Sequence, residues 1–243
     1  MKITEKKILI TGGATGLGLG LAERFIQDNN TVIICGRRES ALTEAAKKIP
    51  SIITYRCDLS LRDEREKLFK WIEENHNDLN VLVNNAGIQQ RMNLTDKDYH
   101  SRAKEEITIN IEAPVHLISL FTQLNSLHTL INVTSALAFV PLTRVALYSA
   151  TKSFLHSYTW SLQHLLKPKN IEIIEIIPPA LNTDLGGKGV HDDGLPVNVF
   201  IDTIFKQLEE GKKELTFGFS ENMLQSGPEE LKKIFERMNG ITS

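Results

Sequence analysis

The sequence predicts an α/β protein in which one parallel, doubly wound sheet of seven strands lies between two layers of helices. Short β-branched runs alternate with longer helical patterns along the 243 residues, which is typical of βαβ units. The runs are apolar throughout, as parallel strands buried on both faces are. No Pro- or Ser-rich linker and no repeat of about 20–50 residues interrupts them. We therefore expect a single three-layer α/β/α domain over residues 1–243.

Seven runs are expected to form the strands, in chain order KKILIT, TVIIC, SIITYRC, NVLVNN, TLINVTS, IEIIEII and a weaker ELTFGF. Helices are expected between them at 16–29, 39–49, 61–75, 103–124 and 147–166. A last helix is expected at about 228–239, with Pro228 near its start and Gly240 after its end. Its apolar face is expected to seal the core or to meet another subunit, and consists of Leu231, Ile234, Phe235 and Met238.

Charge and composition exclude several classes of function. The formal net charge is −2 and no basic stripe is present, which argues against a nucleic-acid partner. No stretch approaches the ~18 apolar residues that cross a bilayer, and the N-terminus lacks the apolar region of a signal peptide. Cys35 and Cys57 show no ligand spacing, and the seven histidines are scattered. We expect a cytoplasmic protein with reduced cysteines, no metal site and no membrane contact.

A glycine turn follows the first expected strand and opens the first helix. In TGGATGLG, glycines 12, 16 and 18 follow G-x-x-x-G-x-G spacing. Such a turn lets backbone N–H groups approach a diphosphate at a helix N-terminus. A P-loop is excluded because Leu19 and Gly20 stand where it needs Lys and Ser or Thr. The alternative is a glycine-rich connection without a ligand. Gly20 is expected to permit close helix–sheet packing instead.

The end of the second expected strand predicts which dinucleotide binds. A carboxylate there would bind the adenosine ribose and repel a 2′-phosphate, but the sequence has Arg37 and Arg38 and no acid before Glu39. Two guanidiniums offer fork-shaped donors to a phosphate. NADP(H) is therefore the preferred cofactor, with NAD(H) possible. The alternative is that both arginines are solvated residues at a helix start.

These motifs, taken together, resemble a known family. TGGATGLG, Asp58, NNAG at 84–87, Asn110, Ser135, YSATK at 148–152 and a Pro-x-x-x-x-Thr segment at 178–183 occur in this order. Over residues 6 to about 211 the chain resembles a single-domain short-chain dehydrogenase/reductase with a Rossmann-type fold. Finer stretches such as VIICGRRE and PPALNTDL resemble the DltE-like subfamily. The name of this subfamily does not specify a reaction.

Ser135, Tyr148 and Lys152 are the candidate catalytic side chains. Ser135 ends an expected strand at the carboxyl edge of the sheet, where ligands of such sheets bind. Tyr148 and Lys152 are four residues apart on one helix face, and an ammonium beside a phenol favours the phenolate. The resemblance implies that Tyr148 transfers the substrate proton and that Ser135 binds the substrate oxygen. It implies that Lys152 lowers the Tyr148 pKa and holds the nicotinamide ribose. The alternative is a solvated Y-x-x-x-K pair.

Asn110 is the fourth candidate, for a reason that the helix itself supplies. Pro114 lacks an N–H, so the carbonyl of Asn110, four residues earlier, loses its helical partner. We expect this carbonyl to face the cleft and to hold a water that links to Lys152. The alternative is a plain proline kink.

The resemblance also implies the remaining cofactor contacts. Asp58 would bind the adenine amine, Leu59 would offer its backbone N–H, and Thr183 and Leu181 would hold the carboxamide. The full expected set is Gly12, Thr15, Gly16, Leu17, Gly18, Arg37, Arg38, Asp58, Leu59, Asn85, Ala86, Gly87, Tyr148, Lys152, Leu181 and Thr183. Pro179 stands where the family usually has glycine, which removes an N–H beside the substrate.

The substrate side of the site is less defined by the sequence. A mildly apolar wall is expected from Gln89, Gln90, Ala136, Leu137, Pro141, Leu142 and Pro179. The glycine-rich stretch at about 184–198 is expected to form a mobile loop that orders on binding. His156 lies one turn after Lys152 and is interpreted as a packing or subunit contact. Relatives form dimer faces from the segments at 103–124 and 148–167, so a homodimer or homotetramer is expected.

Three functions are compatible with these residues. The first is an NADP(H)-dependent oxidoreductase that interconverts a small carbonyl compound and an alcohol, with Tyr148 as proton donor or acceptor. The second is a cofactor-binding scaffold or redox sensor without turnover, against which the intact candidate residues argue. The third is an epimerase or dehydratase, which usually carries a larger C-terminal domain than the ~60 residues after Thr183.

Overall fold

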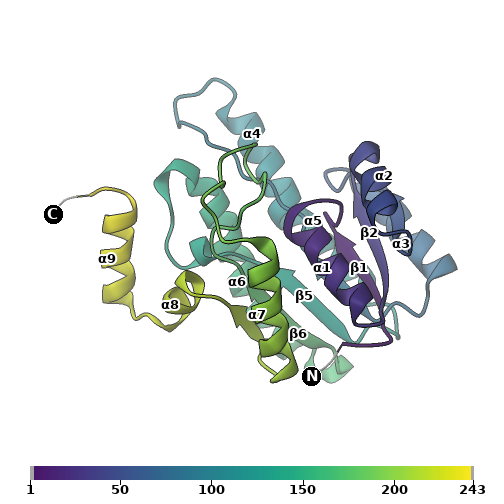
Figure 1. The fold of residues 1–243 in the computed structure, drawn as a ribbon. Helices are drawn as coiled ribbons and strands as arrows, with labels where there is room; N and C mark the ends of the chain where they lie inside the picture. Colours follow the sequence, from purple (N-terminus) through teal and green to yellow (C-terminus); the bar gives the residue numbers. More distant parts are fainter. Residues whose placement is uncertain (1–2, 242–243) are drawn as a thin grey trace.

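A computed structural model describes residues 3–241, so residues 1–2 and 242–243 of the expected 1–243 domain lie outside the described part. Seven strands form one parallel sheet in the order β3-β2-β1-β4-β5-β6-β7, which is the expected doubly wound topology (Figure 1). The strands are β1 Lys7–Thr11, β2 Thr31–Gly36, β3 Ile53–Arg56, β4 Val81–Asn84, β5 Thr129–Val133, β6 Glu172–Ile177 and β7 Glu214–Thr216.

The strands are buried because both faces of the sheet are covered. In β1, Ile8 and Ile10 belong to the core on one face, whereas Leu9 belongs to the core on the other. Burying both faces explains why the strands are apolar throughout. Phe25, Leu42 and Phe200 come from α1, α2 and α7 and fill the first core. The second core holds side chains of α3, α5 and α6.

The helices around the sheet have the following bounds: α1 Gly16–Gln27, α2 Glu39–Lys48, α3 Arg62–Asn75, α4 Tyr99–Ile107, α5 Ala113–Phe121, α6 Ala146–Leu165, α7 Val197–Glu209, α8 Phe219–Gln225 and α9 Pro228–Met238. None of the helices in residues 3–241 is long and apolar enough to cross a membrane. Gly20 packs against another helix rather than the sheet, because a Cβ there would lie 2.5 Å from Cδ1 of Ile201 in α7.

The structure differs from the expected elements in three places. The segment expected as one helix over 103–124 is divided by a π-helix, Thr108–Glu112, into α4 and α5. Pro114 lies in the first turn of α5, so its missing N–H coincides with this wider turn. The sequence reading did not identify α7, and the run expected as a strand to Phe219 ends at Thr216, with Phe219 opening α8.

The C-terminal helix α9 has the expected apolar face and packs on this chain. Ile234 is buried in a small cluster with Ala136, Val140 and Met223. Leu231, Phe235 and Met238 pack against the same cluster. Figure 1 shows α9 beyond the end of the sheet, on the side of α8. The helix therefore supports the loop after β5, in which Ala136 follows Ser135.

Candidate active site

A cleft of about 1200 Å³ lies over the carboxyl edge of the sheet. Segments that follow β1 to β6 all contribute to its wall, as the topology of an open parallel sheet requires. All sixteen residues expected to contact the cofactor line it, and so do Ser135 and the substrate candidates Gln89, Gln90, Ala136, Leu137, Leu142 and Pro179. Pro141 and Asn110 are not part of this wall.

The glycine turn between β1 and α1 requires glycine at two of its positions, by conformation at Gly16 and by lack of room at Gly18. Gly16 has φ +55°, a conformation that favours glycine. A Cβ on Gly18 would lie 2.4 Å from the carbonyl oxygen of Gly12 and 2.5 Å from Nδ2 of Asn85. Asn85 donates from that Nδ2 to the carbonyls of Thr11 and Gly12, at 2.9 and 3.2 Å. The NNAG segment thus holds the turn in shape.

The N-terminus of α1 is suited to an anion. Its N-cap residue Thr15 makes no capping hydrogen bond, and its first turn has no acidic residue. The first N–H groups of the helix therefore keep their donor capacity, and the helix dipole favours negative charge there. Arg38 donates to Oγ1 of Thr15 across 3.5 Å, so a guanidinium lies beside the turn. These features fit the diphosphate of a dinucleotide.

Arg37 and Asp58 lie at the same end of the cleft and already have partners. Arg37 pairs with Glu105 at 3.5 Å. Asp58 accepts hydrogen bonds from the backbone and hydroxyl of Ser60, at 2.9 and 2.7 Å. Burial raises the pKa of the Asp58 carboxyl, but the bonds from Ser60 and the charge of Arg37 outweigh it and hold the pKa below its usual value.

Asn110 contributes its side chain to the framework of the site. Its Oδ1 accepts from the backbone N–H of Ile88 at 2.9 Å, and its Nδ2 donates to the Ile88 carbonyl at 2.8 Å. The same Nδ2 donates to Oγ1 of Thr151 in α6 at 3.1 Å. The buried amide therefore joins the segment after β4 to the helix that carries Tyr148 and Lys152.

Ser135, Tyr148 and Lys152 are brought together as the sequence predicts. Tyr148 is in the first turn of α6, and the Ser135 side chain lies near enough to its hydroxyl to lower the pKa of the phenol in part. Ser135 Oγ also accepts from the N–H of Leu137 at 3.1 Å. Lys152 is one turn further along α6, 96% buried, with Nζ 5.6 Å from the centre of the Tyr148 ring.

The expected lowering of the Tyr148 pKa by Lys152 is not found. Burial raises the pKa of the phenol above its ordinary value, although the nearby Ser135 side chain lowers it in part. Burial also lowers the pKa of Lys152 to about 8. The ammonium bonds to the Val133 carbonyl at 2.8 Å. Desolvation therefore outweighs the attraction that the four-residue spacing predicted.

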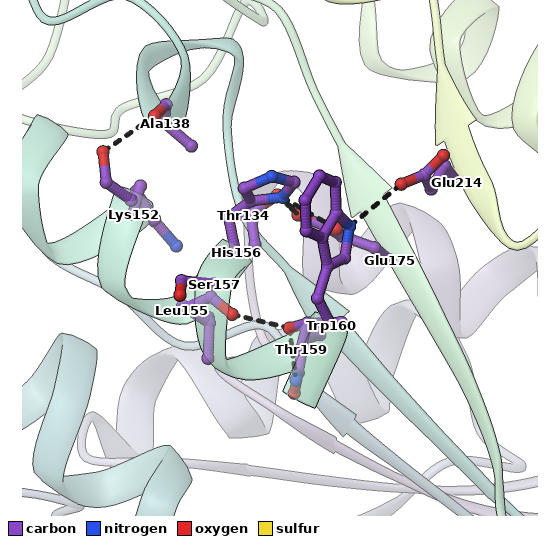
Figure 2. Close-up of polar contacts among 12 residues, drawn as sticks. Thr134, Ala138, Lys152, Leu155, His156, Ser157, Thr159, Trp160, Glu175 and Glu214 are labelled. Atoms are coloured by element: carbon purple, nitrogen blue, oxygen red, sulfur yellow. Dashed lines mark hydrogen bonds and ion pairs between the residues drawn. The ribbon is translucent and has the colours of Figure 1, made fainter. Parts of the chain in front are cut away.

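A buried polar cluster next to the site was missed by sequence reasoning. His156 Nδ1 lies 2.9 Å from Oε1 and 3.0 Å from Oε2 of Glu175, and Thr134 donates to the same Oε1 at 2.6 Å (Figure 2). The His156 ring also contacts the rings of Phe139 and Trp160 in tilted arrangements, with centroids 4.6 and 4.7 Å apart. It is therefore a packing residue, as interpreted, and a partner of a carboxylate. The sequence held one signal for this cluster, because Glu175 is an acidic residue inside the apolar run IEIIEII.

Three basic residues in the cleft wall were also missed. Arg91, Arg144 and His191 lie in the loops that follow β4, β5 and β6. His191 Nε2 lies 3.2 Å from Oε1 of Gln89, which joins the loop after β6 to the loop after β4. Isolated residues in loops have no periodic pattern, so the sequence offered no signal for them.

Comparisons with known proteins agree with this fold and site. Residues 6–193 match the family model described as short chain dehydrogenase. The chain is 39% identical over 253 aligned residues to the protein named "Uncharacterized oxidoreductase DltE" of Bacillus subtilis (strain 168), covering 98% of each chain. An oxidoreductase of Staphylococcus saprophyticus is 29% identical and covers 77% of this chain and 83% of its own length.

Solved structures show the same fold. A short chain dehydrogenase from Burkholderia cenocepacia J2315, in complex with NADP, has a TM-score of 0.84 at 23% identity and covers 98% of this chain and 99% of its own. A short-chain dehydrogenase from Sphingobium yanoikuyae, in complex with NADPH, has a TM-score of 0.77 at 22% identity, with 87% of each chain covered. On the family model and the full-length similarity, the chain belongs to the short-chain dehydrogenase/reductase family and, within it, to the DltE-like group.

Proposed function

We propose that the chain is an NADP(H)-dependent oxidoreductase that interconverts a carbonyl compound and an alcohol. The observation that carries this proposal is that Ser135, Tyr148 and Lys152 line one cleft of about 1200 Å³, with Ser135 close enough to the phenol to act on its pKa. Two hydroxyl groups that converge there can hold one substrate oxygen between them. Relatives of similar fold were crystallised with NADP or NADPH.

The residues of the glycine turn and of β2 would hold the cofactor. The N-terminal N–H groups of α1 would bind the diphosphate, and Arg37 and Arg38 would bind the 2′-phosphate of NADP(H). Asp58 and Leu59 would hold the adenine, and Leu181 and Thr183 the carboxamide. The bound cofactor supplies the hydride.

The protein supplies proton transfer and orientation. Ser135 donates to the substrate oxygen and stabilises the charge that develops on it. Tyr148 keeps its proton in the buried site and delivers it to that oxygen. Lys152 holds the nicotinamide ribose hydroxyls. Asn110 does not line the cleft, so its part is to fix α6 through its side-chain bonds to Ile88 and Thr151 rather than to hold a water with its carbonyl. Proton transfer by a positioned group typically contributes about 10²–10⁴-fold to the rate.

A homodimer or homotetramer in the cytoplasm is part of this proposal. Exposed apolar side chains on α4 and α6, namely Ile107, Phe154, Trp160 and Leu165, would be covered by a second copy. The competing function, a scaffold or redox sensor without turnover, needs the cofactor site but no aligned Ser135 and Tyr148.

A panel of aldehydes and ketones, followed by NADPH absorbance, tests the proposal. The wild type is expected to oxidise NADPH with at least one member, and Tyr148→Phe is expected to abolish this while NADPH still binds. Retained turnover in Tyr148→Phe would refute the assignment of the proton donor. NADPH binding without turnover across the panel would favour the scaffold.

A further inference from the structure

The substrate end of the cleft carries positive charge. Arg91 follows Gln90 in the loop after β4, Arg144 lies four residues before Tyr148, and His191 lies in the loop after β6. All three line the cleft. Arg37 and Arg38 follow β2, on the other side of β1 from these three loops. The charge at this end therefore comes from different strand ends than the arginines of the proposed cofactor-phosphate site.

Neither of the two arginines at this end has an anionic partner. Among residues 3–241, the side chains of Arg91 and Arg144 make no ion pair and no hydrogen bond, and both are exposed to solvent. The carboxylates in the same wall do not neutralise them. Glu105 pairs with Arg37, and Asp58 accepts from Ser60. Asp184, also in the wall, forms no ion pair with either guanidinium.

His191 lies in the same cleft wall as the two guanidiniums. Burial lowers the pKa of His191, and the charges of Arg91 and then Arg144 lower it further. Its Nε2 lies 3.2 Å from Oε1 of Gln89. Two loops therefore each contribute a guanidinium without an anionic partner to the cleft wall that also holds His191 and Gln89.

Apolar side chains also line this end of the cleft. Leu137, Leu142, Val190, Phe219 and Met238 line it together with the three basic residues. A ligand pocket with an apolar body and a few convergent polar groups fixes the orientation of its ligand through those groups. Guanidiniums match carboxylate and phosphate oxygens in geometry and charge.

We propose that the substrate is a carbonyl compound with an apolar body and an oxyanion group, a carboxylate or a phosphate, which Arg91 and Arg144 bind while Ser135 and Tyr148 hold the carbonyl oxygen. This inference rests on the proposed oxidoreductase function. It assigns Arg91 and Arg144 to substrate binding rather than to proton transfer.

Three aldehydes of one shape test the proposal by turnover. They are 4-formylbenzoate, 4-formylphenyl phosphate and the neutral methyl ester of 4-formylbenzoate. The wild type is expected to reduce an anionic aldehyde with a kcat/KM at least about tenfold above that of the ester, as a charge-assisted contact implies. Preference for one anion over the other distinguishes carboxylate from phosphate. Equal kcat/KM for all three would overturn the proposal and leave the oxidoreductase function standing.

Variants assign the preference to the two arginines. Arg91→Gln/Arg144→Gln is expected to reduce kcat/KM for the anionic aldehydes at least about tenfold more than for the ester, mainly through KM. Lys188→Gln, in the loop that carries His191 but outside the cleft wall, is the charge-matched control and is expected to keep the wild-type ratio. An unchanged ratio in the double variant would overturn the assignment.

Binding without turnover separates this inference from the proposed function. In Tyr148→Phe loaded with NADPH, the Kd of each aldehyde is measured by the change in NADPH fluorescence. Tighter binding of an anionic aldehyde than of the ester, lost in the Arg91→Gln/Arg144→Gln background, supports the inference even if no aldehyde is reduced. Equal Kd values for anion and ester, or a preference that survives the double substitution, would overturn it.

Discussion

The ammonium of Lys152 donates to the carbonyl oxygen of Val133 at 2.8 Å, although Tyr148 is its neighbour one helical turn away. Val133 is the last residue of β5, two positions before Ser135. The lysine therefore ties the start of α6 to the end of the strand that presents Ser135.

Because burial raises the pKa of Tyr148, the phenol is expected to stay protonated in the free protein above pH ~10, its ordinary pKa. The difference in ultraviolet absorbance between wild type and Tyr148→Phe, titrated upward from neutral pH, isolates this group. No phenolate signal is expected at pH ~10. A phenolate that appears below pH ~9 would show that the Lys152 charge outweighs burial.

Arg37→Asp is expected to shift the cofactor preference toward NADH. The substitution removes a donor for the 2′-phosphate and adds a like charge, so the ratio of Kd(NADPH) to Kd(NADH) should rise by about 10- to 100-fold. Fluorescence titration with both cofactors measures it. Arg62→Asp, a charge change of the same kind in α3, is the control. The same ratio in both variants would exclude the phosphate contact.

Glu106 is expected to make stability depend on pH. Its carboxyl is fully buried, and neither of its oxygens has a hydrogen-bond partner among residues 3–241. Burial raises its pKa to about 7, whereas the backbone N–H of Gln90, which is near the carboxyl without forming a hydrogen bond, and the charge of Arg102 lower it in part. A raised folded-state pKa stabilises the fold fully below the unfolded value of ~4.3, and this contribution is lost as the pH rises to about 7.

Glu106→Gln keeps the shape of the protonated carboxyl and removes its titration. The free energy of unfolding of the variant, minus that of the wild type, is expected to increase between about pH 5 and pH 7, by up to ~1.4 kcal/mol per pH unit. Urea unfolding across this range measures the difference, with Glu105→Gln as the control on the same helix. A difference that stays constant with pH would mean that the folded carboxyl is ionised.

His156→Ala is expected to destabilise the fold by about 1–3 kcal/mol, because it removes the ring whose Nδ1 contacts both oxygens of the fully buried Glu175 side chain. Adding Glu175→Gln should recover part of the loss, since the amide carries no charge. Urea unfolding of both variants measures this. The exposed His164 of the same helix provides the control as His164→Ala. If the stability lost in the double variant equals the sum of the losses from His156→Ala and Glu175→Gln alone, the pairing of His156 with Glu175 is contradicted.

Amide hydrogen exchange in the loop at about 184–198 is expected to become slower when NADPH binds. Its two ends meet where Leu181 pairs with Leu195, and a Cβ on Gly194 would lie 2.5 Å from the carbonyl carbon of Leu181. Gly194→Ala should therefore reduce the protection that NADPH gives, whereas Gly227→Ala, with open space around it, should not. Equal exchange with and without NADPH would exclude ordering of the loop.

The sequence predicted the parts of the molecule that depend on periodic patterns. Apolar runs located all seven strands, and Ser135, Tyr148 and Lys152 were placed in one cleft by strand ends and helical spacing. Helix α7 was missed because its pattern begins directly after the glycine-rich loop. The bond from Lys152 to Val133 was missed because a backbone acceptor has no sequence signature. Arg91 and Arg144 line the same cleft only because the fold brings two separate loops to it, which no sequence pattern indicates.

The end of β5 is held from three directions before any ligand arrives. Lys152 bonds to the carbonyl of Val133, Glu175 accepts the hydroxyl of Thr134, and the Leu137 N–H bonds to the hydroxyl of Ser135. Three consecutive residues thus lose their conformational entropy during folding rather than during binding. If Ser135 binds the substrate oxygen as proposed, that oxygen would meet a donor already fixed in place, and little of its binding free energy would be consumed in ordering the protein.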